Sequence, residues 1–230
     1  MSTVDNALVI LSKAPEAGQS KTRLVPPLSF ADAAELAHAL LTDQLENLAN
    51  FSAAQLFLAY TPLSASNFFE ALMPKRDSCF GQQGDSLGDR VRHALEHLFA
   101  RGFKRVILIG GDLPTLPLAI LNDAFASLQS KDCEVVLGPS VDGGYYLVGM
   151  NELVADIFAD IEWSRNNVLA MTLEKLNALN KKYKLVGSWY DIDTIDDLRR
   201  LELDCGPESA GSMKKTSTLL QKFKQGGKLK

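Results

Sequence analysis

The chain has 230 residues, of which 46% are hydrophobic and 23% charged, and its formal net charge is −4. These values are ordinary for a globular protein with one large α/β domain or, less readily, two small ones. No apolar run approaches the ~20 residues that a membrane-spanning helix needs, which argues against a membrane protein.

The charge is unevenly distributed along the chain. Residues 206–230 contain six lysines and one acidic residue, which leaves a net charge of −9 on residues 1–205. We therefore expect a single acidic domain over 1–205 and a basic, solvated C-terminal tail over 206–230. The acidic body argues against nucleic acid as the main partner, although the tail alone could touch RNA or an acidic lipid surface.

The N-terminus and the cysteines indicate a cytoplasmic protein. The first residues include an apolar stretch but no preceding basic region and no small-residue cleavage site, so we interpret them as a first strand. Cys79, Cys133 and Cys205 are an odd number, widely spaced and without a Cys-x-x-Cys pair. That pattern predicts free thiols in a reducing compartment and no zinc site.

Strand and helix patterns alternate through the first 140 residues. Strands are expected at 6–12, 55–60, 77–80, 106–109, 134–137, 145–148 and 183–192. Helices are expected at 29–48, 65–72, 87–100, 117–128, 154–158, 168–179 and 194–203. This order predicts a mostly parallel sheet covered by helices on both sides. The two strands between 134 and 148 are too close for a crossover helix, so one of them should be antiparallel and the sheet mixed.

Asp112 follows a buried, β-branched strand that ends in two glycines, Gly110 and Gly111. Open α/β sheets bind ligands at the carboxyl ends of such strands, so Asp112 is a candidate magnesium ligand beneath a nucleotide phosphate. The alternative is an ordinary helix cap or turn aspartate.

The loop after the first strand carries Lys13, Gly18, Lys21 and Arg23. A glycine allows close backbone approach and the cations offset charge, so the loop is suited to phosphates. It is not a Walker loop, because Gln19 and Ser20 separate Gly18 from Lys21 and two prolines soon follow. The alternative is an exposed basic loop.

Three further groups of residues indicate a binding site less specifically than Asp112 and the loop after the first strand. Asp142, Gly143 and Gly144 favour a tight hairpin turn, with close approach to a ligand as the alternative. Asp191 and Asp193 lie where the last strand meets the last helix, so their carboxylates should point to opposite faces and only one should reach a ligand; helix capping is the alternative. His93 and His97 have metal-ligand spacing but no third ligand, which favours exposed histidines.

Together, six ordered stretches resemble a known family. They are Lys13-Ala-Pro-x-x-Gly18-x-x-Lys21-Thr-Arg23-Leu, Gln83-Gly84-Asp85-x-Leu87-Gly88-x-Arg90, Gly111-Asp112-x-Pro114, Gly138-Pro-x-x-Asp142-Gly-Gly-Tyr145-Tyr-Leu-x-Gly149, Trp163-Ser164 and Asp191-Ile-Asp193-Thr194-x-x-Asp197-Leu. The chain resembles bacterial glycosyltransferase-like proteins of the GT-A, nucleotide-diphospho-sugar transferase fold, some of them named for radical SAM or selenium-related domains. More distantly it is similar to the molybdenum-cofactor and phospholactate guanylyltransferases.

The resemblance implies a three-layer α/β/α domain and assigns roles to the matching residues. Lys13, Gly18, Lys21 and Arg23 would bind the nucleotide phosphates, and the loop of Gln83, Gly84 and Leu87 would approach the base. Asp112 and Asp193 would hold Mg²⁺ or Mn²⁺. Asp142, Gly143, Gly144 and Tyr145 would face the acceptor or sugar. Asp112, Asp142 and Lys21 would be the catalytic residues.

One departure affects the expected reaction. Many GT-A glycosyltransferases carry Asp-x-Asp, but here the third position is Pro114, which cannot ligate metal. A second carboxylate must therefore come from elsewhere, and Asp193 or Asp191 could supply it. We expect a nucleotide-sugar transferase in the broad sense, acting on a small-molecule acceptor. The alternatives are a nucleotidyltransferase that releases pyrophosphate and a non-catalytic nucleotide-binding protein.

Overall fold

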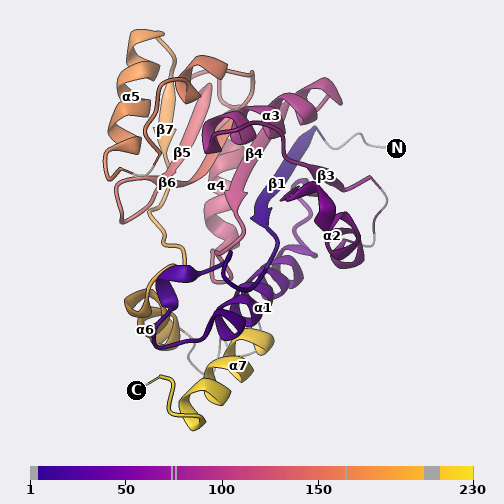
Figure 1. Cartoon of the computed structure of the whole chain (residues 1–230). Helices are drawn as coiled ribbons and strands as arrows, with labels where there is room; N and C mark the ends of the chain where they lie inside the picture. The colour runs from indigo at the N-terminus through magenta and orange to yellow at the C-terminus, as the bar shows by residue number, and fades with distance from the viewer. Residues whose placement is uncertain (1–4, 74, 76, 164, 205–212, 230) are drawn as a thin grey trace. The chain divides into compact units, whose positions relative to one another are not determined.

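The structure, a computed structural model, describes residues 5–73, 75, 77–163, 165–204 and 213–229 (Figure 1). Cys205 and Ser164, both named in the sequence predictions, lie outside these residues. The chain divides into two compact units. The first contains 1–11, 51–110 and 117–190, and the second contains 12–50, 111–116 and 191–230.

The first unit is built on a mixed sheet of seven strands. They are β1 (Asn6–Lys13), β2 (Gln55–Thr61), β3 (Cys79–Gly81), β4 (Arg105–Gly110), β5 (Val135–Pro139), β6 (Tyr145–Met150) and β7 (Tyr183–Leu185). The order across the sheet is β3-β2-β1-β4-β6-β5-β7. β1 runs parallel to β4, whereas β6 is antiparallel to both β4 and β5. The predicted mixed, mostly parallel sheet with an antiparallel strand before residue 150 is confirmed.

The central strands β1 and β4 are apolar because they are covered on both faces. The four residues Ala7 to Ile10 are fully buried, and Val106 to Ile109 are at most 6% exposed. Such continuous apolar runs are typical of parallel strands inside a sandwich of helices. The two strands end side by side, with Leu11 paired to Gly110.

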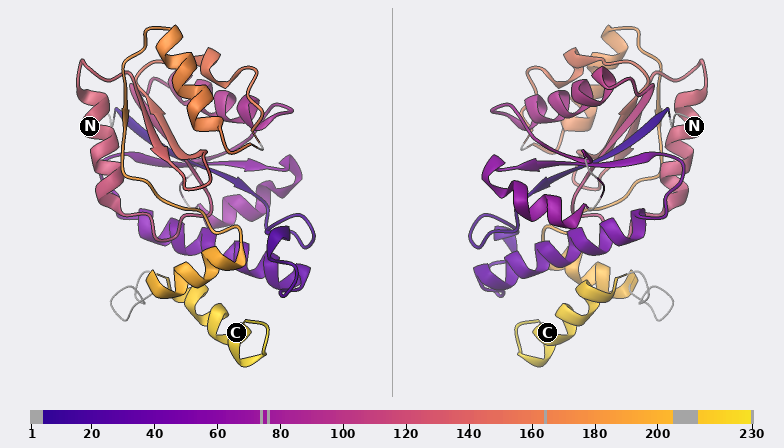
Figure 2. Two further views of the ribbon diagram at one scale, coloured as in Figure 1. Left: turned by 90° about the vertical axis from the view of Figure 1, so that its left-hand side faces the viewer. Right: turned by 90° about the vertical axis from the view of Figure 1, so that its right-hand side faces the viewer.

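Helices cover both faces of this sheet (Figure 2). On one face, α3 (Leu87–Ala100) buries Val91 and Leu95 against alternate residues of the strands, together with η3 (Ala155–Phe158) and α5 (Val168–Ala178). On the other face lies α4 (Leu118–Gln129), where a Cβ at Gly149 would stand 3.3 Å from Leu128. The predicted three-layer α/β/α fold is confirmed.

The edge of the sheet beyond β2 carries a short helical segment. η2 (Leu63–Ala65) leads into α2 (Ser66–Leu72), whose Phe69 is fully buried and stacks on Tyr60 of β2.

Two predicted elements differ from the structure. Segment 155–158 is a 3₁₀ turn, and the last strand ends at Leu185 instead of 192. β7 pairs with β5, and Pro139 at the end of β5 has no N–H group to extend the ladder. Beyond this point only an isolated bridge between Ser140 and Trp189 remains.

The second unit contains η1 (Thr22–Leu24), α1 (Phe30–Leu48), α6 (Ile195–Asp204) and α7 (Lys214–Gln225). As predicted, Ser29 begins α1: its hydroxyl accepts the Asp32 N–H, and the Asp32 carboxylate accepts from the Ser29 amide. The two bonds satisfy amides that the first turn of a helix leaves free.

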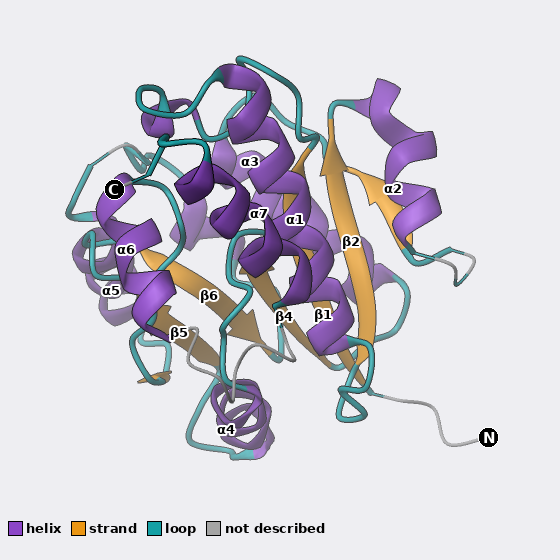
Figure 3. Cartoon of the chain, turned by 90° about the horizontal axis from the view of Figure 1, so that it is seen from below, coloured by secondary structure: helices purple, strands orange, loops and turns teal. Residues whose placement is uncertain are grey.

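The expectation of a solvated C-terminal tail is wrong for α7, which packs along α1 (Figure 3). Leu219, Leu220 and Phe223 of α7 are at most 6% exposed. The lysines dominate the charge of this segment, but its apolar residues recur at helical spacing and form a buried stripe. Within the described residues, no helix combines the length and apolar composition that crossing a bilayer requires.

Candidate functional site

The loop after β1 is folded back on itself by its own polar groups. The Ser20 hydroxyl donates to the Ala14 carbonyl at 2.8 Å, and Lys13 Nζ donates to the Gln19 carbonyl at 3.0 Å. Lys13 therefore braces the loop, and Gly18 is exposed with a φ of +78°. The loop turns through Lys21, itself left-handed at φ 50°, into the 3₁₀ turn η1, so the rejection of a Walker loop is confirmed.

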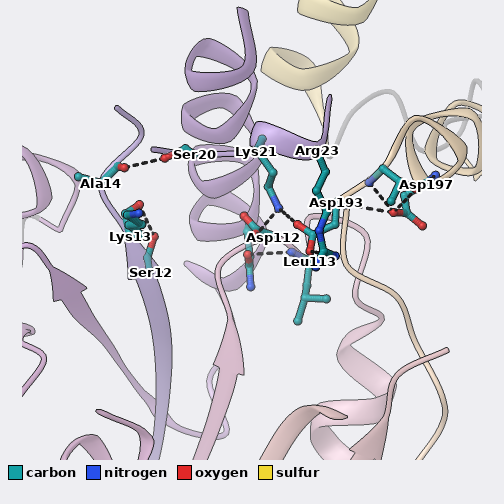
Figure 4. A network of polar contacts seen from close by, with 12 residues as sticks. Ser12, Lys13, Ala14, Ser20, Lys21, Arg23, Asp112, Leu113, Asp193 and Asp197 are labelled. Carbon is teal, nitrogen blue, oxygen red and sulfur yellow. Dashed lines mark hydrogen bonds and ion pairs between the residues drawn. The ribbon is translucent and has the colours of Figure 1, made fainter. Parts of the chain in front are cut away.

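The side chain of Lys21 lies between two carboxylates from distant parts of the sequence (Figure 4). Its Nζ is 2.5 Å from Asp112 Oδ2 and 2.8 Å from Asp193 Oδ1. The Lys21 side chain is only 4% exposed, whereas each aspartate side chain is 38% exposed. The carboxylates thus enclose one ammonium group and remain accessible from outside.

Arg23 lies at the outer side of the same cluster. Its Nη1 is 3.7 Å from Asp193 Oδ2, and its side chain is 73% exposed. A guanidinium in this position adds positive charge near the carboxylates, and because the side chain is largely exposed it is accessible to an anionic ligand. The structure thus brings Lys21, Arg23, Asp112 and Asp193 together.

Helix α1 holds the segment that carries Asp112. The Leu113 N–H donates to Gln44 Oε1 at 3.2 Å, and Asn47 Nδ2 donates to the Pro114 carbonyl at 2.8 Å. Gln44 is 2% exposed. The alternative of Asp112 as a helix cap is wrong, because α4 begins six residues later at Leu118 with Pro117 as its cap.

Asp193 is positioned by the start of α6. The N–H groups of Asp193 and Thr194 donate to Asp197 Oδ2 at 3.1 and 2.7 Å, and the Asp197 N–H donates back to the Thr194 hydroxyl at 3.3 Å. Thr194 and Asp197 therefore cap the helix, which leaves the Asp193 carboxylate free for Lys21.

The prediction that Asp191 and Asp193 point to opposite faces assumes a strand through residue 192, but β7 ends at Leu185, so the strand argument does not apply to these two residues. Burial, followed by the negative charge of Asp193, raises the pKa of Asp191 to about 6, and Asp112 adds to the effect. Asp191 therefore shares the electrostatic environment of the other two carboxylates.

Lys21 and Asp193 stabilise each other's charged form. Burial opposes the charge of Lys21, but the carboxylates of Asp112 and Asp193 outweigh it and raise the lysine's pKa. Burial likewise opposes the charge of Asp193, yet Lys21 and then Arg23 lower its pKa. Lys21 and Asp193 are therefore charged at neutral pH.

The remaining predicted site residues belong to the first compact unit. Gln83, Gly84 and Leu87 are exposed around the start of α3, where Ser86 caps the helix and Arg90 Nε donates to the Gly84 carbonyl at 3.0 Å. Arg90 fixes the shape of this loop.

The loop between β5 and β6 is the hairpin that the sequence favours. Ser140 N donates to the Gly144 carbonyl at 3.0 Å, Gly143 has a φ of +89°, and the exposed Asp142 accepts the Gly144 N–H. Tyr145 differs from the expectation of a ligand-facing residue, because its ring packs into the core against Trp163.

Comparison with known proteins places the chain in a family. Residues 44–165, just over half of the chain, match the model of DUF2064, described as an uncharacterized protein conserved in bacteria. The chain belongs to the DUF2064 family. A crystal structure from Desulfovibrio desulfuricans G20, which carries the provisional name nucleotide-diphospho-sugar transferase, is similar over 96% of both chains, with 30% identity and a TM-score of 0.88.

Two further relatives of this DUF2064 protein are nucleotidyltransferases by name. Phosphoenolpyruvate guanylyltransferase of Mycobacterium leprae is 31% identical over 132 residues, which are 55% of this chain and 59% of that relative. The chain therefore matches somewhat over half the length of this relative. A cytidylyltransferase of Leptospira borgpetersenii shares the fold, with a TM-score of 0.62 and 16% identity over 98% of this chain and 96% of that one.

The donor set suits a divalent cation such as Mg²⁺. Two carboxylate oxygens already converge on one positive charge, the ammonium group of Lys21. Among the described residues, no group of three or more His, Cys, Asp or Glu forms a complete metal cage. Mg²⁺ is commonly held by one or two carboxylates, with water and substrate phosphates completing its shell, so Asp112 and Asp193 fit it.

Sequence reasoning missed the residues that support the site. Gln44 and Asn47 lie on an amphipathic helix, where polar residues are expected on the exposed side. The sequence holds no signal that Gln44 is buried, because burial of its amide depends on how the segment from Gly111 to Leu116 returns to α1.

Proposed function

We propose that this DUF2064 protein is a metal-dependent transferase that moves a nucleotidyl group from a nucleoside triphosphate to a small-molecule acceptor. The observation that carries the proposal is Lys21 held between Asp112 and Asp193, with Arg23 beside them. A buried ammonium group between two accessible carboxylates, next to an exposed guanidinium, suits a triphosphate and its metal ion.

The residues have separable roles in such a reaction. An acceptor oxyanion forms a new bond to the α-phosphorus while the bond to the pyrophosphate oxygen breaks. Lys21 and Arg23 would bind the phosphates and stabilise the charge on the departing pyrophosphate. Asp112 and Asp193 would hold a divalent cation, which when bound neutralises phosphate charge.

Two observations favour nucleotidyl over glycosyl transfer. Pro114 stands where many GT-A glycosyltransferases have the second carboxylate of Asp-x-Asp, so the carboxylate pair comes from distant segments instead. The guanylyltransferase relative also supports this reaction class and makes a guanine nucleotide the first donor to test, with phosphoenolpyruvate as the first acceptor. Within the proposal, the loop of Gln83, Gly84 and Leu87 approaches the base, and the hairpin of Asp142 to Gly144 faces the acceptor.

Glycosyl transfer from a nucleotide-diphospho-sugar is the second candidate. The relative from Desulfovibrio desulfuricans, similar over almost the whole chain, carries that name. Lys21 and Arg23 would then stabilise a leaving nucleoside diphosphate, and Asp142 is the candidate base if the reaction inverts the sugar. In either case we infer a cytoplasmic enzyme, because the sequence pattern of its cysteines suits a reducing compartment.

Thermal unfolding in the presence of candidate donors tests the proposal. A ligand at 100 times its dissociation constant stabilises the folded state by about 2.7 kcal/mol. A Mg²⁺-dependent rise in Tm with one nucleoside triphosphate, followed by pyrophosphate release when acceptors are added, is the expected result. A rise with a nucleotide-diphospho-sugar and release of its nucleoside diphosphate would favour glycosyl transfer. Binding without turnover across a broad acceptor panel would favour a non-catalytic protein.

The variant Asp112→Asn tests the site itself. Because an amide does not replace the carboxylate charge, we expect this variant to lose the Mg²⁺-dependent part of the nucleotide stabilisation. Asp123→Asn is the matched control. It makes the same chemical change at an exposed residue of α4, which belongs to the first compact unit. Full Mg²⁺-dependent stabilisation of Asp112→Asn would contradict the assignment.

A further inference from the structure

The ammonium group of Lys21 occupies the position that a cation shared by Asp112 and Asp193 would take. It donates to one oxygen of each carboxylate, at 2.5 and 2.8 Å. A metal ion bound between the same oxygens would meet this ammonium group at contact distance, so the two cations exclude each other.

We propose that Lys21 is the resident counter-cation of the Asp112–Asp193 pair, so that a divalent cation binds there only when the Lys21 ammonium group withdraws. This inference rests on the proposed function, since it takes a metal ion and nucleotide phosphates as the ligands. It adds an order to them: a nucleotide phosphate offers Nζ a new anionic partner, and the vacated carboxylates then accept the metal.

The backbone of Lys21 is held in place, so any withdrawal of the ammonium group has to come from rotation of the side chain. The Lys21 carbonyl accepts the Leu24 N–H at 3.0 Å, and Ser20 is tied to Ala14, so the main chain is held on both sides. The lysine side chain is a flexible four-carbon stem with a compact charge at its end, so the ammonium group can change position without a change in the backbone. The carboxylates are 38% exposed, which leaves an entry for a hydrated metal ion.

Exchange of one cation for another explains why Lys21 is buried at a binding site. Without it, Asp112, Asp191 and Asp193 would place several carboxylates close together, and Arg23, which lies near Asp193, is largely exposed. Like charges at short range destabilise the folded protein. Lys21 therefore neutralises the free site and also ties the metal affinity to occupancy by phosphate. Because such coupling is reciprocal, metal must strengthen phosphate binding by the same factor.

Direct Mn²⁺ binding to the free protein tests this inference without any enzymatic assay. The titration counts unbound Mn²⁺ by electron paramagnetic resonance, in the absence of nucleotide, for wild type, Lys21→Met and Lys21→Gln. Lys21→Met removes the charge at nearly the same side-chain length, and Lys21→Gln retains a hydrogen-bond donor should the first variant fold poorly. Circular dichroism checks that each variant is folded.

We expect both variants to bind Mn²⁺ about 5- to 150-fold more tightly than wild type, the usual range for coupled sites. Arg23→Leu is the matched control, because it removes one positive charge from the outer side of Asp193 without emptying the position between the carboxylates. Its Mn²⁺ affinity should rise by a smaller factor. Adding Asp112→Asn to Lys21→Met should abolish the gain.

The outcomes separate this inference from the proposed function. If wild type shows Mg²⁺-dependent stabilisation by a nucleotide but Lys21→Met and Lys21→Gln bind Mn²⁺ no more tightly than wild type, only the counter-cation role is overturned. An equal gain in Arg23→Leu would also overturn it, since general charge would then account for the effect. Absence of Mn²⁺ binding in every protein, together with no nucleotide stabilisation, would overturn both.

Discussion

At the scale of single residues, the site depends on side chains whose partners lie far away in the sequence. Lys21 is separated from Asp112 by 91 positions and from Asp193 by 172. Hydrogen bonds position each partner. Gln44 accepts the N–H of Leu113, the residue after Asp112, and Thr194 with Asp197 caps α6, which leaves the carboxylate of Asp193 available to Lys21. The geometry of the site therefore depends on these supporting residues as well as on the residues that would touch a ligand.

Gln44→Leu should weaken both the fold and the site. The substitution leaves the buried N–H of Leu113 without its acceptor, which costs about 1–3 kcal/mol. It also releases the segment that carries Asp112, so the Mg²⁺-dependent rise in Tm with nucleotide should shrink. Urea unfolding and thermal shift measure the two effects. Gln129→Leu, at an exposed position of α4, is the control and should change neither. If folded Gln44→Leu keeps the full Mg²⁺-dependent rise in Tm with nucleotide, Gln44 does not support the site.

At the scale of elements, α7 is attached to α1 by a buried carboxylate as well as by apolar packing. Asp43 of α1 is fully buried and accepts the N–H groups of Lys215 and Thr216, at 3.2 and 2.8 Å. These are first-turn amides that α7 cannot satisfy itself. A residue of one helix therefore caps another, 172 positions further along the chain.

Asp43→Ala should lower the free energy of unfolding by about 1–3 kcal/mol, because two first-turn amides of α7 lose their buried carboxylate acceptor. Urea unfolding at neutral pH measures the change. Glu46→Ala is the control on the same helix: Glu46 pairs with Lys215, but both side chains are about half exposed, so less than about 1 kcal/mol should be lost. Equal losses in the two variants would argue against a special role of the cap.

The contact between α1 and the end of the chain should depend on pH. The hydrogen bonds from Lys228 and Ser29 lower the pKa of Asp32 to about 2. Because the pKa of an unfolded aspartate is about 3.9, this stabilisation is present above that pH and is lost as the pH falls toward 2.

Urea unfolding between pH 2 and pH 6 for wild type and Lys228→Met measures this stabilisation. The gap between the two proteins should be widest above pH 4 and close toward pH 2. Lys222→Met is the control, since its partner Glu35 is 51% exposed and contributes less. A gap that is constant across the range would show that the Asp32–Lys228 pair does not carry the effect.

At the scale of the whole molecule, the charge pattern and the packing of the C-terminal segment have to be considered together. Its lysines pair with acids of α1 and α6, among them Glu35 and Glu202. The positive excess of residues 206–230 thus offsets part of the negative charge on the rest of the chain. The buried face of α7 makes the segment part of the fold.

A chain truncated after residue 212 should be clearly less stable than the full chain. It loses the burial of Leu219, Leu220 and Phe223, each worth about 1.5–3 kcal/mol. Thermal unfolding and light scattering should show a lower Tm and aggregation. The double variant Lys222→Gln/Lys224→Gln removes two charges but leaves the buried face intact, and should stay close to wild type. An unchanged Tm after truncation would support the expectation that this segment is a solvated tail.

The sequence by itself determined the elements and the class of fold. Apolar runs such as Val106 to Ile109 predict buried strands, and capping pairs such as Ser29 with Asp32 mark helix starts, because both signals are local. The ordered motifs also identified the family and named Lys21, Arg23, Asp112 and Asp193. The sequence predicts too long a last strand. The residue that ends the pairing of β7 is Pro139 in β5, and a pattern within residues 183–192 gives no sign of it.

Only the tertiary structure decided how these residues meet. It placed the Lys21 ammonium group between two carboxylates, buried Gln44 against the amide of Leu113, and packed the helix α7 of the basic segment along α1. The ligand-binding roles of Gln83, Gly84, Leu87 and Asp142 stay predictions. Contacts between residues 91 or 172 positions apart follow from the course of the whole chain, and local patterns hold no information on such distances.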